Sequence, residues 1–171
     1  MLENLNSSIH QKATNLIELC RSHRVTLTTI ESCTGGLVSA ALTDIPGSSE
    51  VFNCGFVTYS NEAKHRLVNV PLALIAKHGA VSQSVAIAMA MGGLKHSNAN
   101  FAVSVTGVAG PGGGTPEKPV GLVHFACVSH KSKPLLFEAR FSGDRNEIRS
   151  QSVEQALLML NHSVETNCKV L

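Results

Sequence analysis

Residues 25–42 read VTLTTIESCTGGLVSAAL and fall into three parts of different character. Residues 25–30 are mostly β-branched and predict a strand, whereas residues 37–42 are small and apolar and predict a helix. The residues between them, 32–36, are Ser-Cys-Thr-Gly-Gly, which is typical of a turn. A strand, a turn of small residues and a helix in this order place the turn at the carboxyl edge of a sheet.

The sequence on either side predicts further helices and strands. Apolar residues recur at helical spacing from Ile9 to Cys20, which predicts an amphipathic first helix capped at Ser7 or Ser8. Apolar or β-branched runs predict strands over residues 53–59, 102–106, 122–128 and 135–141. Capping and breaking residues predict helices that start at Ser60 or Asn61, span residues 71–79 and 82–96, and run from Asp144 to about His162.

These elements predict an α/β fold. Helices and strands alternate in the first half of the chain, which favours parallel strands, and the last two strands are close enough to form an antiparallel hairpin. A three-layer α/β/α sandwich with a mixed, partly parallel sheet fits this order. The 171 residues contain no internal repeat and favour one domain over residues 1–171.

Composition limits the classes of partner. Lys and Arg number 14 against 12 Asp and Glu, a balance too weak to indicate a nucleic-acid surface. No apolar run is long enough to cross a bilayer, and residues 1–10 lack the pattern of a signal peptide. The five cysteines include no Cys-x-x-Cys pair, which argues against a disulfide framework and a cysteine zinc site. We therefore expect a cytoplasmic protein that binds neither nucleic acid nor membrane.

Ser32 is the first candidate for chemistry. A serine just before a helix lies near the open amides of that helix, which can stabilise an oxyanion or hold a phosphate. Gly35 and Gly36 would let a substrate approach the backbone closely. The same pattern also fits Ser32 and Thr34 acting only as helix caps.

The second candidate cluster contains Tyr59 and Lys64. Tyr59 is the only tyrosine and falls at a strand end, with Lys64 about one turn into the next helix. A lysine whose pKa is lowered by burial can act as a general base, although a solvated helix lysine fits the sequence equally. The eight histidines show no metal-ligand spacing, so we assign no metal.

Residues 107–121 are dense in glycine and proline but match neither a dinucleotide fingerprint nor a P-loop. These residues could form a glycine-rich wall beside a bound ligand, or could simply connect two elements as a structural crossover. Arg145 opens the last helix, where it could clamp a carboxylate or phosphate, or simply neutralise Asp144 and Glu147.

Taken together, these segments resemble the CinA C-terminal-domain family, the nicotinamide-nucleotide amidases of PncC type. The resemblance covers about residues 5–160, in family order. The matching stretches are residues 31–36, 46–49, 57–64, 78–82, 106–111, 118–121, 143–145 and 148–149. The chain departs from the family pattern at Cys54, Asn69 and Gln83, none of which is a candidate catalytic residue.

The resemblance implies hydrolysis of the carboxamide of nicotinamide mononucleotide to nicotinate mononucleotide and ammonia, without cofactor or metal, in a homo-oligomer. The family's serine, tyrosine and lysine fall on Ser32, Tyr59 and Lys64, and Thr106 and Arg145 would line the substrate site. Many relatives also carry a large N-terminal domain that is absent here, so only the amidase activity of the family is inferred.

We expect Ser32 to attack the amide after losing its proton to Lys64, directly or through Tyr59. The amides of residues 34–36 would hold the oxyanion. Either Arg145 or the helix start at Gly35 and Gly36 would bind the phosphate.

Three alternatives remain open. The chain could be a catalytically silent paralogue that binds a nucleotide, or an amidase that uses Cys33, because thiolates at helix starts are activated. It could also be a structural or interaction protein without turnover.

Overall fold

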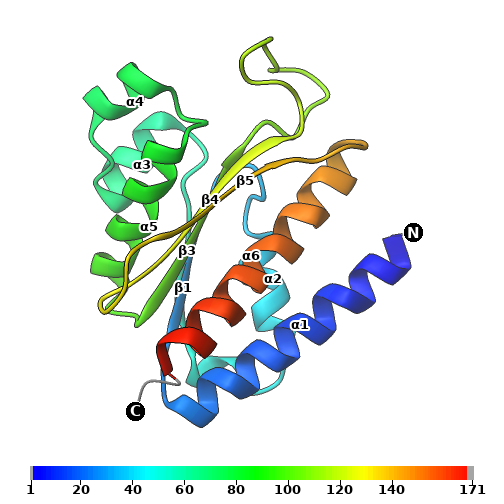
Figure 1. Cartoon of the computed structure of the whole chain (residues 1–171), viewed down its shortest axis with the longest axis vertical. Coiled ribbons are helices and arrows are strands. Elements are labelled where there is room, and N and C mark those ends of the chain that lie inside the picture. The colour runs from blue at the N-terminus through cyan, green and yellow to red at the C-terminus, as the bar shows by residue number, and fades with distance from the viewer. Residues whose placement is uncertain (1, 169–171) are drawn as a thin grey trace.

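Within residues 2–168, which the computed structural model describes with side chains from residue 6 onward, the chain forms a five-stranded sheet between two layers of helices (Figure 1). The strand order is β2-β1-β3-β4-β5. β1 pairs in parallel with β2 and β3, whereas β4 is antiparallel to β3 and β5. The predicted α/β/α sandwich with a mixed, partly parallel sheet is therefore confirmed. The strands are β1 (Leu27–Glu31), β2 (Phe52–Val57), β3 (Phe101–Gly107), β4 (Leu122–Ser129) and β5 (Leu135–Arg140).

Each face of the sheet has its own hydrophobic core. One core includes Leu16 and Leu157 and lies under α1 (Leu2–His23), α2 (Leu37–Thr43) and α6 (Arg145–Cys168). The other includes Ile30 and Met89 and lies under α3 (Asn61–Val68), α4 (Leu72–His78) and α5 (Gln83–Ser97). A short 3₁₀ turn, Ser48–Glu50, precedes β2. Among the described residues, no helix is both long and apolar enough to span a membrane.

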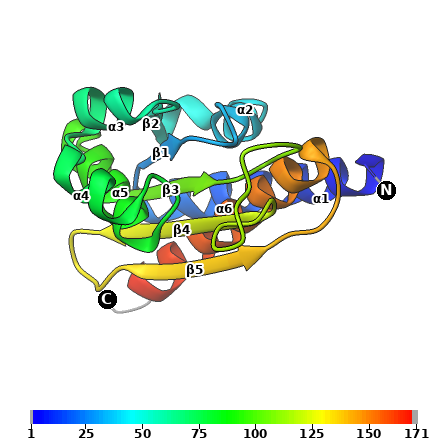
Figure 2. The same ribbon diagram turned by 90° about the horizontal axis from the view of Figure 1, so that it is seen from above.

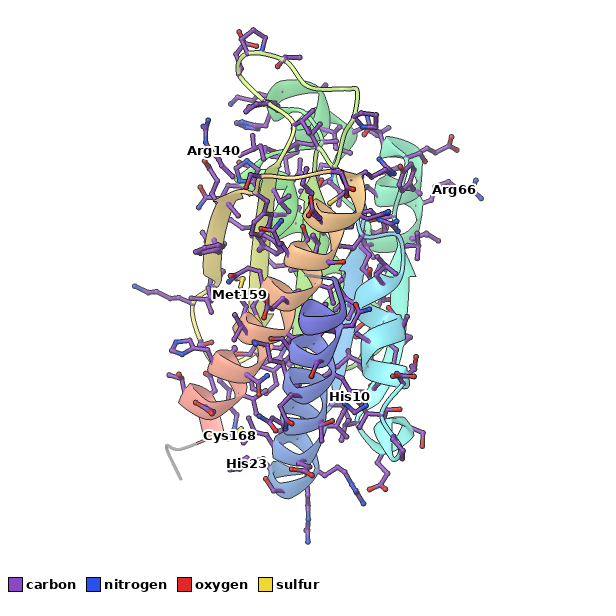
Figure 3. The ribbon with its side chains drawn as sticks, turned by 90° about the vertical axis from the view of Figure 1, so that its right-hand side faces the viewer. His10, His23, Arg66, Arg140, Met159 and Cys168 are labelled. Carbon is purple, nitrogen blue, oxygen red and sulfur yellow. The ribbon has the colours of Figure 1, made fainter. Side chains whose placement is uncertain are left out.

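The first and last helices exceed their predicted bounds. α1 begins at Leu2, so the cap predicted at Ser7 or Ser8 is wrong, and the Ser8 hydroxyl instead donates to Glu154 on α6 at 2.6 Å. α6 continues past His162 because the next turn still buries Val164 against the core. The two helices lie side by side along the molecule (Figure 3).

Gly92 and Gly93 lie in the middle of α5, where glycine lowers helix propensity. The packing explains both residues. A Cβ atom at Gly93 would overlap the side chain of Ile30 on β1, and one at Gly92 would overlap the backbone carbonyl of Val68. Glycine is thus the residue that lets α5 approach β1 and the end of α3.

We expect Gly92→Ala to lower the free energy of unfolding by about 3 kcal/mol, because the added carbon meets backbone that can move only with α3. Urea denaturation of both proteins measures the difference. Gly112→Ala is the matched control, since nothing lies within 4 Å of a Cβ at that position. Equal stability of the Gly92 variant and the wild type would contradict the packing account.

The strand order creates a crevice at one edge of the sheet. From β1 the chain crosses to β2 on one side and then to β3 on the other, so β1 is a topological switch point. Parallel strands end at the same edge, and ligands of open α/β sheets bind where the strand order reverses. Ser32 follows β1, Tyr59 follows β2 by two residues, and Thr106 lies at the end of β3.

Candidate active site

A cavity of about 310 Å³ opens at this edge of the sheet, at the lower end of the size range of small-molecule sites. Residues after β1 and β2 and the end of β3 form its floor. The glycine-rich loop after β3 and the start of α6 form its walls, and the two lie beside each other in Figure 2. The lining residues are Ser32, Cys33, Tyr59, Lys64, Ala80, Val81, Thr106, Gly107, Val108, Ala109, Gly110, Gly112, Gly113 and Arg145.

Ser32 and Lys64 are in direct contact inside this cavity. The Lys64 Nζ lies 3.1 Å from the Ser32 Oγ and also donates to the Thr58 carbonyl at 2.8 Å. Lys64 is 1% exposed and Ser32 is 9% exposed. The alternative of a solvated helix lysine is therefore wrong for Lys64. The solvated cation on this helix is Arg66, which points away from the molecule and pairs with Glu62 at 3.6 Å (Figure 3).

Burial lowers the pKa of Lys64 to about 8, against an opposing effect of the neighbouring Cys33 thiol. No carboxylate forms an ion pair with Lys64 in the part of the chain that the structure describes. A substantial fraction of this amine is consequently neutral in mildly alkaline solution. A neutral amine 3.1 Å from a hydroxyl can take its proton, which is what a serine nucleophile needs.

Cys33 lines the same cavity, but its thiol is poorly suited to attack. Burial raises its pKa to about 11, and the Glu31 carboxylate acts in the same direction. The Cys33 backbone and the cations of Lys64 and Arg149 only partly oppose this rise. The thiol stays protonated near neutral pH, whereas the nucleophile of cysteine enzymes is the thiolate.

Tyr59 and Arg145 meet at the mouth of the cavity. The Arg145 guanidinium donates to the Tyr59 hydroxyl at 3.2 Å and to the Gly110 carbonyl at 2.6 Å. Among the described residues, no hydrogen bond joins the Tyr59 hydroxyl to Ser32 or Lys64. Of the two predicted proton routes, the geometry therefore favours direct transfer from Ser32 to Lys64 over relay through Tyr59.

Arg145 does not neutralise the acidic residues beside it. The Asp144 carboxylate caps α6 by accepting from the backbone N–H groups of Asn146 and Glu147, each within 3 Å. The Glu147 carboxylate accepts from the Asp144 N–H at 2.8 Å. These contacts form a reciprocal capping arrangement and leave the Arg145 charge free to face the cavity.

The structure does not bring Thr34, Gly35 and Gly36 into the cavity wall. Gly36 donates its N–H to the Glu31 carboxylate at 2.9 Å, and Gly35 donates to the Ser32 carbonyl at 3.1 Å. The amides predicted to hold phosphate at this helix start are thus occupied. Thr34 is fully buried, and its Oγ1 has no hydrogen-bond partner among the described residues. Thr106 does line the cavity, and its hydroxyl donates to the Ala80 carbonyl at 2.8 Å.

In the part of the chain that the structure describes, the Ser32 hydroxyl bonds to Lys64 and to no histidine. His124 is buried on β4, with its Nδ1 3.8 Å from the Glu138 carboxylate. Within the described residues, no three His, Cys, Asp or Glu side chains gather so that they could hold a metal ion. Five histidines with predicted polar or helix-end positions are all exposed: His65, His78, His96, His130 and His162.

Sequence comparison finds close relatives. The family model for the CinA C-terminal domain matches residues 9–164. Nicotinamide-nucleotide amidohydrolase PncC from Shigella flexneri and from Escherichia coli strain K12 are each 45% identical over 155 residues, covering 91% of this chain and 94% of each relative. A putative competence-damage inducible protein from Caldicellulosiruptor bescii is 46% identical over 87% of this chain but only 36% of that protein.

Solved structures agree with the sequence comparison. The competence/damage inducible protein CihA from Agrobacterium tumefaciens superimposes with a TM-score of 0.90 at 46% identity, covering 92% of this chain and 96% of that chain. A CinA-superfamily protein from Klebsiella pneumoniae gives a TM-score of 0.88 at 32% identity, covering 92% and 98%. The fold, the ordered motifs and these similarities all indicate the same assignment. The chain belongs to the CinA C-terminal domain family.

Proposed function

We propose that this protein is a nicotinamide-nucleotide amidase that hydrolyses nicotinamide mononucleotide to nicotinate mononucleotide and ammonia, with Ser32 as nucleophile. The observation that carries the proposal is the buried Lys64 amine 3.1 Å from the Ser32 hydroxyl, in a cavity at the switch point of the sheet. The identity of 45% to relatives named nicotinamide-nucleotide amidohydrolase supports the substrate.

The reaction proceeds in two halves. Ser32 Oγ attacks the carboxamide carbon while its proton passes to the neutral Lys64 amine, and the carbonyl oxygen becomes an oxyanion. Lys64 returns the proton to the amide nitrogen, the C–N bond breaks, and ammonia leaves an acyl-serine. A water molecule then attacks the ester carbon, with Lys64 as base, and releases Ser32 and the carboxylate product.

The oxyanion needs N–H donors that are not already used. The Cys33 N–H, next to Ser32 in the cavity lining, has no acceptor in any other described residue. The same holds for Ala109 and Gly110 on the opposite wall of the cavity. We propose that the oxyanion accepts from the Cys33 N–H and from one of these two loop N–H groups, so that the glycine-rich loop acts as a catalytic wall and not as a plain crossover.

We assign the phosphate of the substrate to Arg145, whose charge is exposed at the cavity mouth. Arg145→Ala should raise KM for nicotinamide mononucleotide by about 10- to 100-fold, the loss of one charge-assisted contact, with a smaller change in kcat. Steady-state kinetics with the mononucleotide and with nicotinamide riboside measure this effect. Arg145→Lys is the matched control that retains the charge. Equal turnover of the riboside and the mononucleotide by the wild type would contradict the role of Arg145.

The function itself is tested by incubating purified, metal-stripped protein with nicotinamide mononucleotide and measuring ammonia and nicotinate mononucleotide together. Stoichiometric release of both products establishes the amidase. Binding of the mononucleotide without release would instead indicate a catalytically silent nucleotide-binding paralogue. A protein that neither binds nor hydrolyses the mononucleotide would instead be a structural or interaction protein.

We further propose that residues 1–171 form one amidase domain that works in the cytoplasm as a homo-oligomer. Exposed apolar side chains support self-association, because Phe137 on β5 and Leu158 on α6 line one shallow apolar surface, 44% and 43% exposed. Light scattering of the purified protein measures its mass in solution.

A further inference from the structure

Glu31 is a fully buried carboxylate immediately before the proposed nucleophile. It is the last residue of β1, and four donors from the start of α2 surround it. Its Oε2 accepts from the N–H groups of Gly36 at 2.9 Å and Val38 at 3.1 Å. Its Oε1 accepts from the Ser39 N–H at 2.8 Å and the Ser39 hydroxyl at 2.7 Å. These donors and the positive end of the helix dipole compensate the burial of the charge.

Arg149 binds the other side of the same turn. It projects from α6, and its Nε donates to the Cys33 carbonyl at 3.1 Å while its Nη2 donates to the Thr34 carbonyl at 3.0 Å. The guanidinium thus holds two successive carbonyl groups with its planar fork. Arg149 is half-buried and does not line the cavity.

The turn between these two charges has few other restraints. Ser32 donates its N–H to the Val105 carbonyl on β3 at 2.9 Å, and Gly35 donates to the Ser32 carbonyl at 3.1 Å. Gly35 and Gly36 have φ angles of 60° and 101°, a left-handed conformation that glycine adopts easily and that a flexible segment would also leave easily.

We propose that Glu31 and Arg149 are positioning residues for the amidase reaction, and that together they hold the turn that presents Ser32 to Lys64. Glu31 binds the N–H groups that follow the turn, and Arg149 binds the carbonyl groups within it. The inference rests on the proposed function, because it assumes that Ser32 reacts. Neither side chain touches the cavity, so both act on the placement of Ser32 Oγ and not on substrate binding.

A displacement of the serine by about 1 Å can cost on the order of 10²-fold in rate. We therefore expect Glu31→Gln and Arg149→Met each to lower kcat by about 10²-fold, with KM for nicotinamide mononucleotide within about twofold of wild type. Glutamine keeps the shape of Glu31 but turns an amide donor toward the N–H groups of α2. Methionine keeps part of the Arg149 stem but donates to neither carbonyl.

Three further variants make the comparison specific. Ser39→Ala removes one of the four donors to Glu31 and leaves the backbone contacts, so its kcat should stay within about threefold of wild type. Arg21→Met removes an exposed arginine that pairs with Glu50, and should have wild-type kinetics. If Glu31→Gln fails to fold, Arg149→Lys tests the proposal instead. A lysine amine can donate to one of the two carbonyl groups but lacks the planar fork that binds both, so kcat should lie between those of wild type and Arg149→Met.

A second measurement is independent of the amide substrate. A fluorophosphonate forms a covalent bond to an activated serine with release of fluoride, and mass spectrometry measures the rate at Ser32. This rate should fall in Glu31→Gln and Arg149→Met in parallel with kcat, and stay unchanged in Arg21→Met. Labelling of wild-type Ser32 without hydrolysis of nicotinamide mononucleotide would overturn the proposed function and still test the positioning. Folded variants with wild-type kcat and labelling, or with only KM raised, would overturn the positioning.

Discussion

Ser32→Ala should abolish hydrolysis of nicotinamide mononucleotide, lowering kcat/KM by about 10⁴-fold or more, while the protein remains folded. The expected loss is large because the substitution removes the atom that forms the acyl bond, and among the described side chains only that of Lys64 hydrogen-bonds to Ser32. The fold should survive because Lys64 keeps its hydrogen bond to the Thr58 carbonyl. Coupled detection of ammonia measures the rate, and the melting temperature checks the fold.

Cys33→Ala is the matched control, because it changes the neighbouring cavity residue by a similar volume. With its pKa raised to about 11, the Cys33 thiol is protonated during turnover, so the variant should keep kcat/KM within about threefold of wild type. Loss of activity in Cys33→Ala with retention in Ser32→Ala would contradict the serine mechanism and favour thiol chemistry. Calorimetry on Ser32→Ala should still detect binding of the mononucleotide, which separates loss of chemistry from loss of the site.

Local signals in the sequence predicted the elements that carry the candidate site. The strand, turn and helix over residues 25–42 occur as predicted, because β-branched and small residues act on the backbone nearby. Side chains that cap helices were also readable. Ser60 accepts from the Ala63 N–H at 3.0 Å, and Ser82 accepts from the Val85 N–H at 3.3 Å. The N-terminus of α3 sets the place of Lys64, so the cap at Ser60 helped to predict where that lysine would lie.

Tertiary contacts decided what the sequence alone could not. Whether Lys64 was solvated or buried depended on how α3 packs against β2 and α5, and both outcomes fit the same pattern of residues. The amides of α2 looked available for a phosphate because the sequence does not show where the Glu31 side chain points. A signal did exist: the first turn of α2 has no acidic residue, whereas a glutamate ends the preceding strand. The contacts of Arg149 could not be predicted from neighbouring residues, because its partners lie 116 and 115 residues away in the sequence.

The activity should also depend on pH through Lys64. Its pKa is lowered by burial to about 8, so the amine is protonated below this pH and cannot accept the Ser32 proton. We expect log kcat/KM to rise with pH up to about 8 and then to level off. The substrate's phosphate titrates at a lower pH than this midpoint, because the second pKa of a phosphate monoester is about 6. A midpoint near 6.5 would contradict the assignment of Lys64 as the base.

Two substitutions of Lys64 separate its proton from its charge. Lys64→Met should lower kcat/KM by about 10³-fold or more, and Lys64→Arg should do the same at every pH, because a guanidinium stays protonated. Stability gives a second check with a known sign. Between pH 8 and 10.5 the unfolded chain binds a proton at Lys64 that the native protein releases, so the free energy of unfolding should rise with pH relative to Lys64→Met. If the midpoint of kcat/KM lies near pH 8, the lower end of the range over which stability rises, the activity and the stability both report the titration of the buried Lys64 amine. A stability difference that does not change with pH would show that Lys64 titrates normally and is not the base.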